Sequence, residues 1–335
     1  MKILLDKNKN YYKANLHTHT DLSDGYRSQE DIKEAYKARG YSVVAFTDHE
    51  FLIDASHLTD SEFVALNGCE LTVKENDTQS TKTNNTLRVT HLCLYAESPD
   101  NIITPCYSSK YSKKFLGDSA EGKIHQSGEY ERVYSPEGIS DIIRRAHDAG
   151  FLVCYNHPGW SLELDGRYLQ YEGLDFVEIF NTGCVKMGFS DDEAVFSTML
   201  LEGKNIFCTA ADDCHSGGRE YPLGDSFLGF VMINADTLSY ENVISALKSG
   251  SFYASFGPEI LSLTLDEGVV TVECSPSRKI SILYRGRFCD SVHGKTNEPL
   301  THATFRLRER TDGFRIKVED ASGRCAWSQF YGISQ

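Results

Sequence analysis

The sequence predicts an α/β fold, in which a parallel sheet or a β/α barrel precedes a small antiparallel β module. Two observations support this prediction. Up to about residue 257, short apolar runs alternate with stretches of helical periodicity, and a repeated strand–helix–strand order is typical of a parallel sheet. After residues 255–258, SFGP, the runs alternate apolar and polar residues instead. That period of two is typical of strands with one buried face.

The elements of the first part are bounded by recognisable signals. Strands are predicted over 13–17 (KANLH), 41–49 (YSVVAFTDH), 63–71 (FVALNGCEL), 88–96 (RVTHLCLYA), 152–158 (LVCYNHP), 176–181 (FVEIFN) and 206–215 (IFCTAADDCH). Helices are predicted over 28–40, 135–150 and 190–203. Ser28 and Ser135 suit N-caps, and Gly40 and Gly150 suit helix stops. Residues 97–134 have no clear period, and we expect a long insertion that acts as a lid.

The last part reads as a small antiparallel β-sandwich. Its strands are predicted over 261–265, 269–274, 279–284, 303–308 and 314–320. Two sets of alternate residues are each expected to share one face: Leu261, Leu263 and Leu265, and Phe314, Ile316 and Val318. The predicted domains are therefore 1–257, with an insertion at about 97–134, and 258–335. We expect the second domain to have a structural role.

Composition excludes several classes of protein. The formal net charge of −14 opposes binding to a nucleic-acid polymer or an anionic membrane, although a nucleotide or short oligonucleotide remains open as a substrate. No apolar run is long enough to span a bilayer, and the N-terminal MKILLDKNKNYYK does not resemble a signal peptide. The ten cysteines are scattered without a CxxC pair, which indicates reduced, buried thiols. We expect a cytoplasmic protein, with its oligomeric state open.

The stretch NLHTHTDLSDG (15–25) contains the first candidate site. His17 and His19 lie two residues apart after a predicted strand, so both side chains point to the same side and can share a metal ion. An HxH pair alone is weak evidence. The same residue types recur at or near other strands: His49, Glu70, His91, His157, and the pair Asp213 and His215. Strand ends of a β/α barrel converge on one mouth, so the pattern predicts a metal cluster there.

Taken together, these motifs resemble the PHP family of metal-dependent phosphoesterases, named for polymerase and histidinol phosphatase. The resemblance is carried by HTHTDLSDG (17–25), TDH (47–49), the glutamate of GCEL (68–71), the histidine of VTHL (89–92), NHP (156–158) and DDCH (212–215). It implies a distorted seven-stranded, TIM-like (β/α)7 barrel over the first domain. The FYASFGP segment (252–258) and the β tail resemble one bacterial branch of the family.

The resemblance also implies a cluster of two or three divalent ions, which could be Zn, Mn or Fe. By the family pattern, His17 and His19 bind one ion with Glu70 and Asp213. Glu70 then bridges to a second ion that is held by His91 and His157. A third ion is held by Asp24, His49 and His215, and Asp48 supports the site from behind.

The implied reaction is the hydrolysis of a small phosphomonoester or phosphodiester by a hydroxide that bridges the metals. Glu70, Asp213 and His215 would be catalytic through the bound metals. Three divalent ions carry a charge of about +6 against about −3 from the three carboxylate ligands, and the surplus suits a phosphate group. Arg219 and Lys186 are candidate substrate-binding residues.

Two alternative functions remain open. The same metals could hydrolyse a carboxylic ester or a carbamate, because a polarised carbonyl needs much the same nucleophile and Lewis acid. A non-catalytic binding module is the third possibility, although such a module has no reason to keep nine potential ligands. The sequence does not name the substrate.

Overall fold

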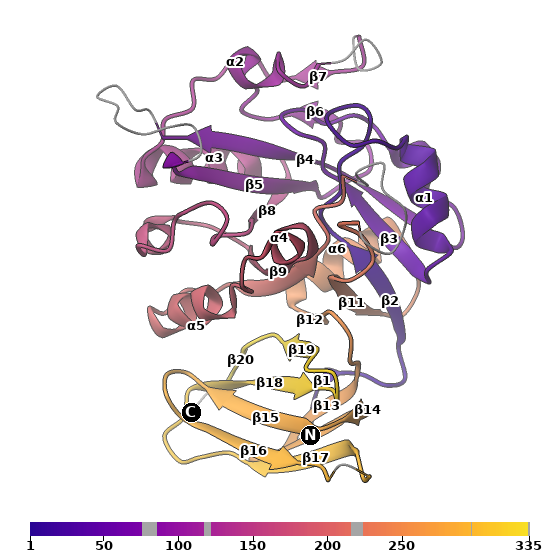
Figure 1. The fold of residues 1–335 in the computed structure, drawn as a ribbon, viewed down its shortest axis with the longest axis vertical. Coiled ribbons are helices and arrows are strands. Elements are labelled where there is room, and N and C mark those ends of the chain that lie inside the picture. Colours follow the sequence, from indigo (N-terminus) through magenta and orange to yellow (C-terminus); the bar gives the residue numbers. More distant parts are fainter. Residues whose placement is uncertain (76–85, 117–121, 216–223, 296, 334–335) are drawn as a thin grey trace.

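The computed structural model describes residues 1–75, 86–116, 122–215, 224–295 and 297–333. It shows a mixed α/β fold that is followed by an antiparallel β region (Figure 1). No helix among these residues is long and apolar enough to cross a membrane. All ten cysteines are free; nine of them are buried, as expected, and Cys289 is exposed.

Seven strands form the part of the sheet that carries the predicted site. In spatial order they are β10 (Phe207–Ala211), β9 (Phe176–Asn181), β8 (Phe151–Tyr155), β5 (Val89–Ala96), β4 (Val64–Lys74), β3 (Tyr41–Phe46) and β2 (Asn10–Asn15). Four neighbouring pairs are parallel. β5, however, is antiparallel to both β4 and β8. The predicted parallel order is therefore interrupted at β5, because β5 runs back along β4 from the Lys74–Val89 pair.

The two ends of this seven-stranded run meet just beyond the strands themselves. Thr18, which follows β2, forms a parallel bridge with Cys214, which follows β10. The backbone N–H of His19 donates to the Cys214 carbonyl over 2.9 Å, and the Cys214 N–H donates to the His17 carbonyl over 3.3 Å. On its other side β2 continues the sheet into β11. The bridge thus brings the first and last predicted ligand segments together.

The predicted helices of the first part are present. They are α1 (Gln29–Lys37), α3 (Pro136–Asp148) and α5 (Glu193–Leu201). Ser28 caps α1 by accepting a hydrogen bond from the Asp31 N–H, and Ser135 caps α3 by accepting one from the Gly138 N–H. Gly40 and Gly150 follow their helices with φ values of +77° and +80°. That left-handed conformation favours glycine, which confirms both predicted stops.

A second group of elements links the seven strands to the β region. It consists of β11 (Phe230–Ala235), α6 (Tyr240–Ser249) and β12 (Phe252–Ser255). β11 is antiparallel to both β2 and β12, and β12 pairs with β19 (Cys325–Ser328) of the C-terminal region. One sheet of fourteen described strands therefore runs through both parts of the molecule (Figure 1).

The C-terminal β region consists of two sets of antiparallel strands around one buried cluster. The first set is β1 (Lys2–Leu5), β13 (Ile260–Asp266), β14 (Val269–Ser277) and β17 (Leu300–Arg306). The second set is β19, β18 (Gly313–Glu319), β15 (Lys279–Tyr284) and β16 (Cys289–His293), with β20 (Tyr331–Gly332) paired to β18. β1 pairs with β13, so the N-terminal strand lies in the region that the sequence assigned to 258–335. The two domain boundaries otherwise stay a prediction.

The two predicted faces of the β region have different outcomes. Phe314, Ile316 and Val318 are all buried, as expected. Leu263 is buried too, but 41% of Leu261 is exposed. The register of β13 against β14 shifts between Ile260 and Ser262, and such an irregularity turns the side chains on one side of it to the opposite face.

The insertion at 97–134 contains short elements only. They are β6 (Ile103–Thr104), α2 (Ser109–Ser112) and β7 (His125–Gln126). β6 and β7 pair with each other and form a small separate sheet, which lies above the site-bearing strands in Figure 1. Residues 117–121 are outside the described part of the chain.

One ion pair near the end of α3 gives a pH-dependent contribution to stability. His147 Nε2 lies 2.8 Å from Asp175 Oδ2, and Asp175 also accepts a hydrogen bond from the Val153 N–H. The hydrogen bond to Asp175 raises the pKa of His147 above its ordinary value of 6.5. A raised folded-state pKa stabilises the fold below the unfolded pKa, and this stabilisation is lost as the pH rises through the folded pKa.

We expect His147→Gln to lower the free energy of unfolding by about 0.5 kcal/mol near pH 5 and by less near pH 9, because the pair is partly exposed. Urea unfolding at both pH values measures the difference. His302→Gln is the matched control, since His302 is exposed on β17 and has no ion-pair partner among the described residues. A His147→Gln effect that is equal at both pH values would contradict the assignment.

Candidate metal centre

The predicted ligands lie at one edge of the seven strands. His17, His49, His157 and Asp213 follow the C-terminal ends of β2, β3, β8 and β10. Glu70 lies within β4 instead of at its end, because β4 continues to Lys74. His91 is the third residue of β5; since β5 is antiparallel to its neighbours, its beginning lies where their ends lie.

Glu70 is the centre of the cluster, and five imidazoles surround its carboxylate. Its Oε1 lies 3.2 Å from His17 Nε2, 3.1 Å from His91 Nδ1 and 3.4 Å from His157 Nε2. Its Oε2 lies 3.0 Å from His49 Nδ1 and 3.5 Å from His19 Nε2. The carboxylate is 1% exposed. One buried anion is thus in contact with side chains from four other segments of the chain.

Two more carboxylates complete the arrangement. Asp213 Oδ1 lies 3.3 Å from His17 Nε2, 3.1 Å from His19 Nε2 and 3.6 Å from His215 Nδ1. Asp24 lies at the outer side of the cluster, where its side chain is 40% exposed. Its oxygens lie 3.4 Å from His215 Nε2 and 3.6 Å from His49 Nε2. Asp213 therefore belongs to the deep part of the site, and Asp24 to its mouth.

The nine predicted ligand side chains fall into overlapping groups. Four groups place one potential ligand atom from each member within 4.8 Å of the others: His17, His19 and Glu70; Glu70, His91 and His157; His19, Asp24, His49 and His215; and His17, His157 and Glu178. The first three contain the sets that the resemblance implied, except that Asp213 lies beside the first group and His19 also belongs to the third. The fourth contains a residue that sequence analysis did not select.

The donor atoms fit divalent cations. His17 Nε2 and His19 Nε2 face each other at 3.1 Å, where two lone pairs repel unless a proton or a cation lies between them. Nδ1 of His19, His49 and His91 is buried without a hydrogen bond of acceptable geometry. Buried polar atoms are normally satisfied, and imidazole nitrogens beside carboxylate oxygens are the donors that Zn, Mn and Fe accept.

Two members of the cluster, Glu70 and His19, are held in the protonation states that metals require. Burial would raise the pKa of Glu70, but the neighbouring His91 and His17 outweigh it and lower that pKa well below 4.5. Burial, together with His215 and His49, lowers the pKa of His19 to about 3. Glu70 is therefore an anion and His19 a neutral imidazole at neutral pH, the forms that bind metal ions.

Glu178 is a functional residue that sequence analysis missed. It is buried on β9. Its Oε1 lies 3.2 Å from His17 Nδ1, and its Oε2 accepts hydrogen bonds from the His157 N–H and from Asn181 Nδ2. The carboxylate thus contacts the imidazole of His17 and the backbone of His157, both predicted ligands, from behind. The available signal was an acidic residue in the middle of the apolar strand FVEIFN.

Asp48 supports the site in a different way. The backbone N–H of Thr20 donates to Asp48 Oδ1 over 2.7 Å, and the Ser23 hydroxyl donates to the same oxygen over 2.7 Å. Both donors belong to the turn that carries Asp24. Asp48 therefore holds this turn against the cluster, as the sequence predicted for a supporting carboxylate.

Two ligand residues have a backbone conformation that is costly for residues other than glycine. His157 has a φ of +28°, and Asp213 has a φ of +54°. The left-handed region costs an L-residue about 1 to 3 kcal/mol. Such strain is found mainly at functional sites, where surrounding contacts hold it in place. Here it turns both side chains toward Glu70, immediately after their strands end.

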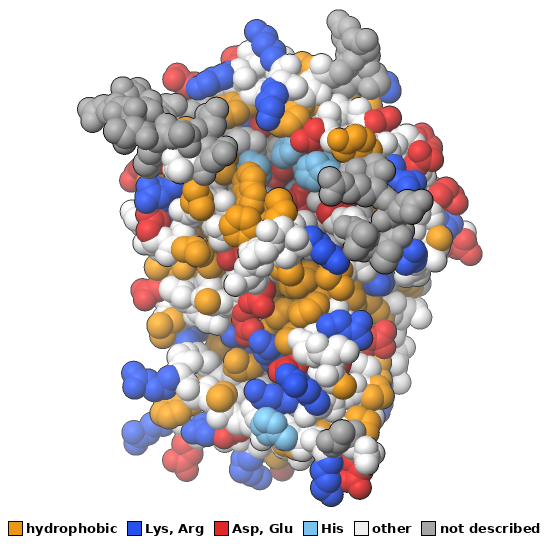
Figure 2. Space-filling view, viewed as in Figure 1, with side chains coloured by type: hydrophobic (Ala, Val, Ile, Leu, Met, Phe, Trp, Pro, Cys, Tyr) orange, Lys and Arg blue, Asp and Glu red, His pale blue; other side chains and the backbone are white. Residues whose placement is uncertain are grey.

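The cluster forms the floor of a pocket of about 960 Å³. In Figure 2 the pale blue histidines lie in a hollow beside red acidic side chains. Lys186, a predicted substrate-binding residue on α4 (Thr182–Met187), lines this pocket. So do four residues of the insertion: Lys110, Tyr111, Lys114 and Phe115. Arg219, the other candidate, lies outside the described residues.

Comparison with known protein families identifies the first part of the chain. Residues 15–153 match the model of the PHP domain. The chain is therefore similar to the PHP family over these residues. The matched residues include six members of the cluster, His17, His19, Asp24, His49, Glu70 and His91. His157, Asp213 and His215 lie beyond the matched stretch, and the fold brings them to the PHP residues.

Three solved structures resemble the chain at low sequence identity. One is a two-domain protein from Bacteroides vulgatus, described as containing a predicted PHP-like metal-dependent phosphoesterase. The two sequences are 14% identical, the match covers 99% of this chain and 96% of that chain, and the TM-score is 0.45. Another, from Bifidobacterium adolescentis, is named as a candidate metal-dependent phosphoesterase, with 15% identity, coverage of 71% and 96%, and a TM-score of 0.37.

The third is an amidohydrolase from Chromobacterium violaceum, solved with bound sulfate and no metal. It shares 14% identity over 63% of this chain and 93% of that chain, with a TM-score of 0.40. No curated protein matches the chain in sequence. The similarity to the PHP family therefore rests on the family model and the motifs.

Replacement of Glu178 tests its role behind the PHP cluster. We expect Glu178→Gln to weaken metal binding by about 10- to 100-fold, because a neutral amide holds the His17 ring less firmly than a carboxylate does. Competition with a metal-binding dye on the metal-free protein measures the affinity. Glu172→Gln, the same change at an exposed position, should leave it unchanged. Equal affinity of wild type and Glu178→Gln would show that Glu178 has no such role.

Proposed function

We propose that the protein is a metal-dependent phosphoesterase that hydrolyses a small phosphomonoester or phosphodiester. The observation that carries this proposal is the combination of the Glu70-centred cluster with basic side chains around the same pocket. Lys110, Lys114 and Lys186 all line it, and none has a carboxylate partner among the described residues. In a chain with a net charge of −14, unpaired cations at one pocket favour an anionic substrate.

The residues that would hold the metals follow from the groups described above. His17, His19, Glu70 and Asp213 would hold one ion, Glu70 with His91 and His157 a second, and Asp24, His49 and His215 a third. Bound there, Zn, Mn or Fe would lower the pKa of water toward neutrality and stabilise negative charge on phosphate oxygens. Two or three ions are proposed, since the third set is the most exposed.

The protein's own residues would then bind and orient the substrate. Lys186 and the insertion lysines supply donors for phosphate oxygens from the rim. The aromatic side chains of Phe115 and Trp160 line the same pocket, where they would exclude water and pack against the rest of the substrate. Glu70, Asp213 and His215 remain the proposed catalytic residues, because they would act through the metals beside the reacting phosphate.

We further propose that the seven site-bearing strands are the distorted barrel that the resemblance implied. The Thr18–Cys214 bridge supports this proposal, since it joins segments at the two ends of the run. The insertion is proposed as a lid for the same pocket, which four of its side chains line. A small phosphorylated molecule would enter between them.

A panel of three substrates tests the reaction type. We expect metal-loaded wild type to hydrolyse p-nitrophenyl phosphate or bis-p-nitrophenyl phosphate faster than p-nitrophenyl acetate. Chelation should abolish turnover, and Mn or Zn should restore it. His17→Ala and Asp213→Asn should each lower kcat at least 100-fold, because each would remove a ligand of the ion proposed between His17, His19, Glu70 and Asp213.

The other outcomes of this panel distinguish the alternatives. Turnover of the acetate ester without either phosphate would favour an ester or carbamate hydrolase. Trace rates that are equal in wild type and both variants would favour a non-catalytic binding module. Either result would contradict the proposed function.

Replacement of the insertion lysines tests the role of the lid. We expect Lys110→Met with Lys114→Met to raise KM for the phosphate substrate about tenfold with little change in kcat, because these groups bind phosphate before and during reaction alike. Steady-state kinetics measure both constants. Lys113→Met is the matched control, because Lys113 is exposed on the same segment and does not line the pocket. An unchanged KM in the double variant would remove the lid lysines from the proposal.

A further inference from the structure

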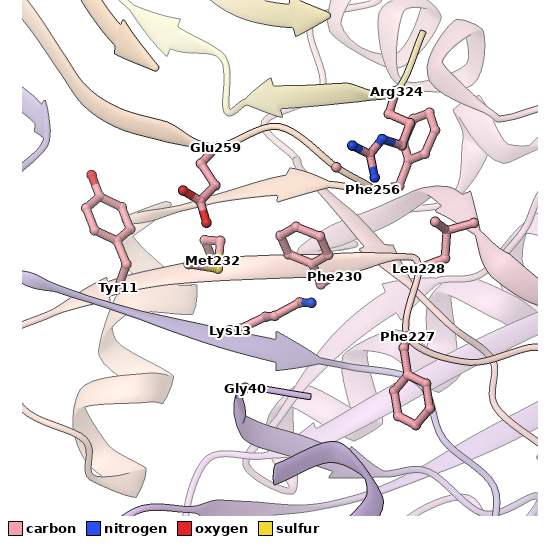
Figure 3. A pocket seen from close by; sticks show the side chains of 11 residues that line it. Tyr11, Lys13, Gly40, Phe227, Leu228, Phe230, Met232, Phe256, Glu259 and Arg324 are labelled. Atoms are coloured by element: carbon pink, nitrogen blue, oxygen red, sulfur yellow. The ribbon is translucent and has the colours of Figure 1, made fainter. Parts of the chain in front are cut away.

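A second pocket lies apart from the metal cluster, where the first part of the chain meets the C-terminal β region. It has a volume of about 320 Å³. Its walls come from β2 and β11, from the loop before β11, and from the segments around Phe256 and Arg324 (Figure 3). We refer to it as the seam pocket. None of its lining residues lines the metal-centre pocket.

Lys13 is the unusual side chain of the seam pocket. Its Nζ lies 4.1 Å from the centre of the Tyr41 ring and 4.4 Å from the centre of the Phe230 ring. The two rings stabilise the positive charge, but they leave the three N–H donors of the ammonium group without a strong acceptor. Lys13 has no ion pair and no hydrogen-bond acceptor among the described residues. A half-buried ammonium group with free donors suits a carboxylate or phosphate oxygen.

The other charged groups of the seam pocket also favour an anion. Arg324 donates from its Nε to Asp320 over 2.7 Å, which leaves its two terminal nitrogens without an acceptor among the described residues. Glu259 is the single carboxylate of the lining, and it is exposed. Water screens its charge more than that of half-buried Lys13. The charges of Glu259 and of the buried Asp212 both act on Lys13, but Asp212 is not part of the lining. Lys13 and Arg324 are therefore the two cationic side chains of the lining that could bind an anion.

The rest of the lining is apolar and held in place. Phe227, Phe230, Phe256 and Met232 contribute rings and a thioether. Phe227 has a φ of +66°, and its backbone N–H donates to the buried carboxylate of Asp212. This bond fixes one wall of the pocket before any ligand arrives. Pockets that are preformed, largely apolar and supplied with a few polar groups are typical small-molecule sites.

We propose that the seam pocket is a second binding site, for a small carboxylic acid with an apolar or aromatic body. The carboxylate would bind Lys13 and the free terminal nitrogens of Arg324, and the body would pack against Phe227 and Phe230. The proposal is independent of the reaction at the metal centre, since the two pockets share no lining residue.

Calorimetric titration of the metal-loaded protein with phenylacetate tests this proposal. We expect binding to wild type, and binding at least tenfold weaker to Lys13→Met, which keeps the apolar stem and removes the charge. Phenylacetamide, which has the same body without the charge, should also bind at least tenfold more weakly than phenylacetate. Arg324→Met removes an exposed group with little risk to folding, and it should weaken phenylacetate binding about threefold.

Two controls locate the binding. Lys295→Met changes a lysine whose side chain is 82% exposed and should leave the affinity unchanged. His17→Ala should also leave it unchanged, because His17 belongs to the metal centre. The proposal is overturned if phenylacetate does not bind at concentrations up to about 10 mM. It is equally overturned if Lys13→Met binds as tightly as wild type, or if His17→Ala loses the binding.

Discussion

The structure depends most on one buried charge, the carboxylate of Glu70. Five imidazoles lie 3.0 to 3.5 Å from its two oxygens, and each comes from a different strand end or turn except for the His17 and His19 pair. An isolated carboxylate at 1% exposure would be far too costly to bury. The buried Glu70 carboxylate therefore needs positive or metal-binding groups around it. Those groups can surround it only because the strands that carry them end at the same edge of the sheet.

The supporting contacts show how the fold meets this requirement. Glu178 contacts the ring of His17 and the backbone of His157. Asp48 holds the turn that carries Asp24, and the Thr18–Cys214 bridge joins the two ends of the strand run. The strained backbone at His157 and Asp213 also helps to position the cluster. Stability is given up locally so that ligand side chains point toward one place.

Much of this arrangement could be predicted from the sequence, for identifiable physical reasons. Strand geometry alone places histidines and acids that follow successive apolar runs at one edge of the sheet. The N-caps Ser28 and Ser135 could be predicted from local hydrogen bonding at the helix start. The direction of β5 could not be predicted from the sequence, because an apolar strand has the same residue pattern whether it pairs parallel or antiparallel. The exposure of Leu261 depends on a register shift in pairing. The place of β1 in the C-terminal sheet depends on pairing with a strand at the other end of the chain, as between Lys2 and Leu265. Glu178 was missed because a single acid in a strand says nothing of what it faces.

Anomalous diffraction from crystals grown with manganese or zinc tests the central claim most directly, since it locates metal ions relative to Glu70. The account predicts at least two anomalous peaks, one beside His17 and His19 and another beside His91 and His157, with Glu70 within coordination distance of both. A map in which no peak lies within about 3 Å of the Glu70 carboxylate would contradict it.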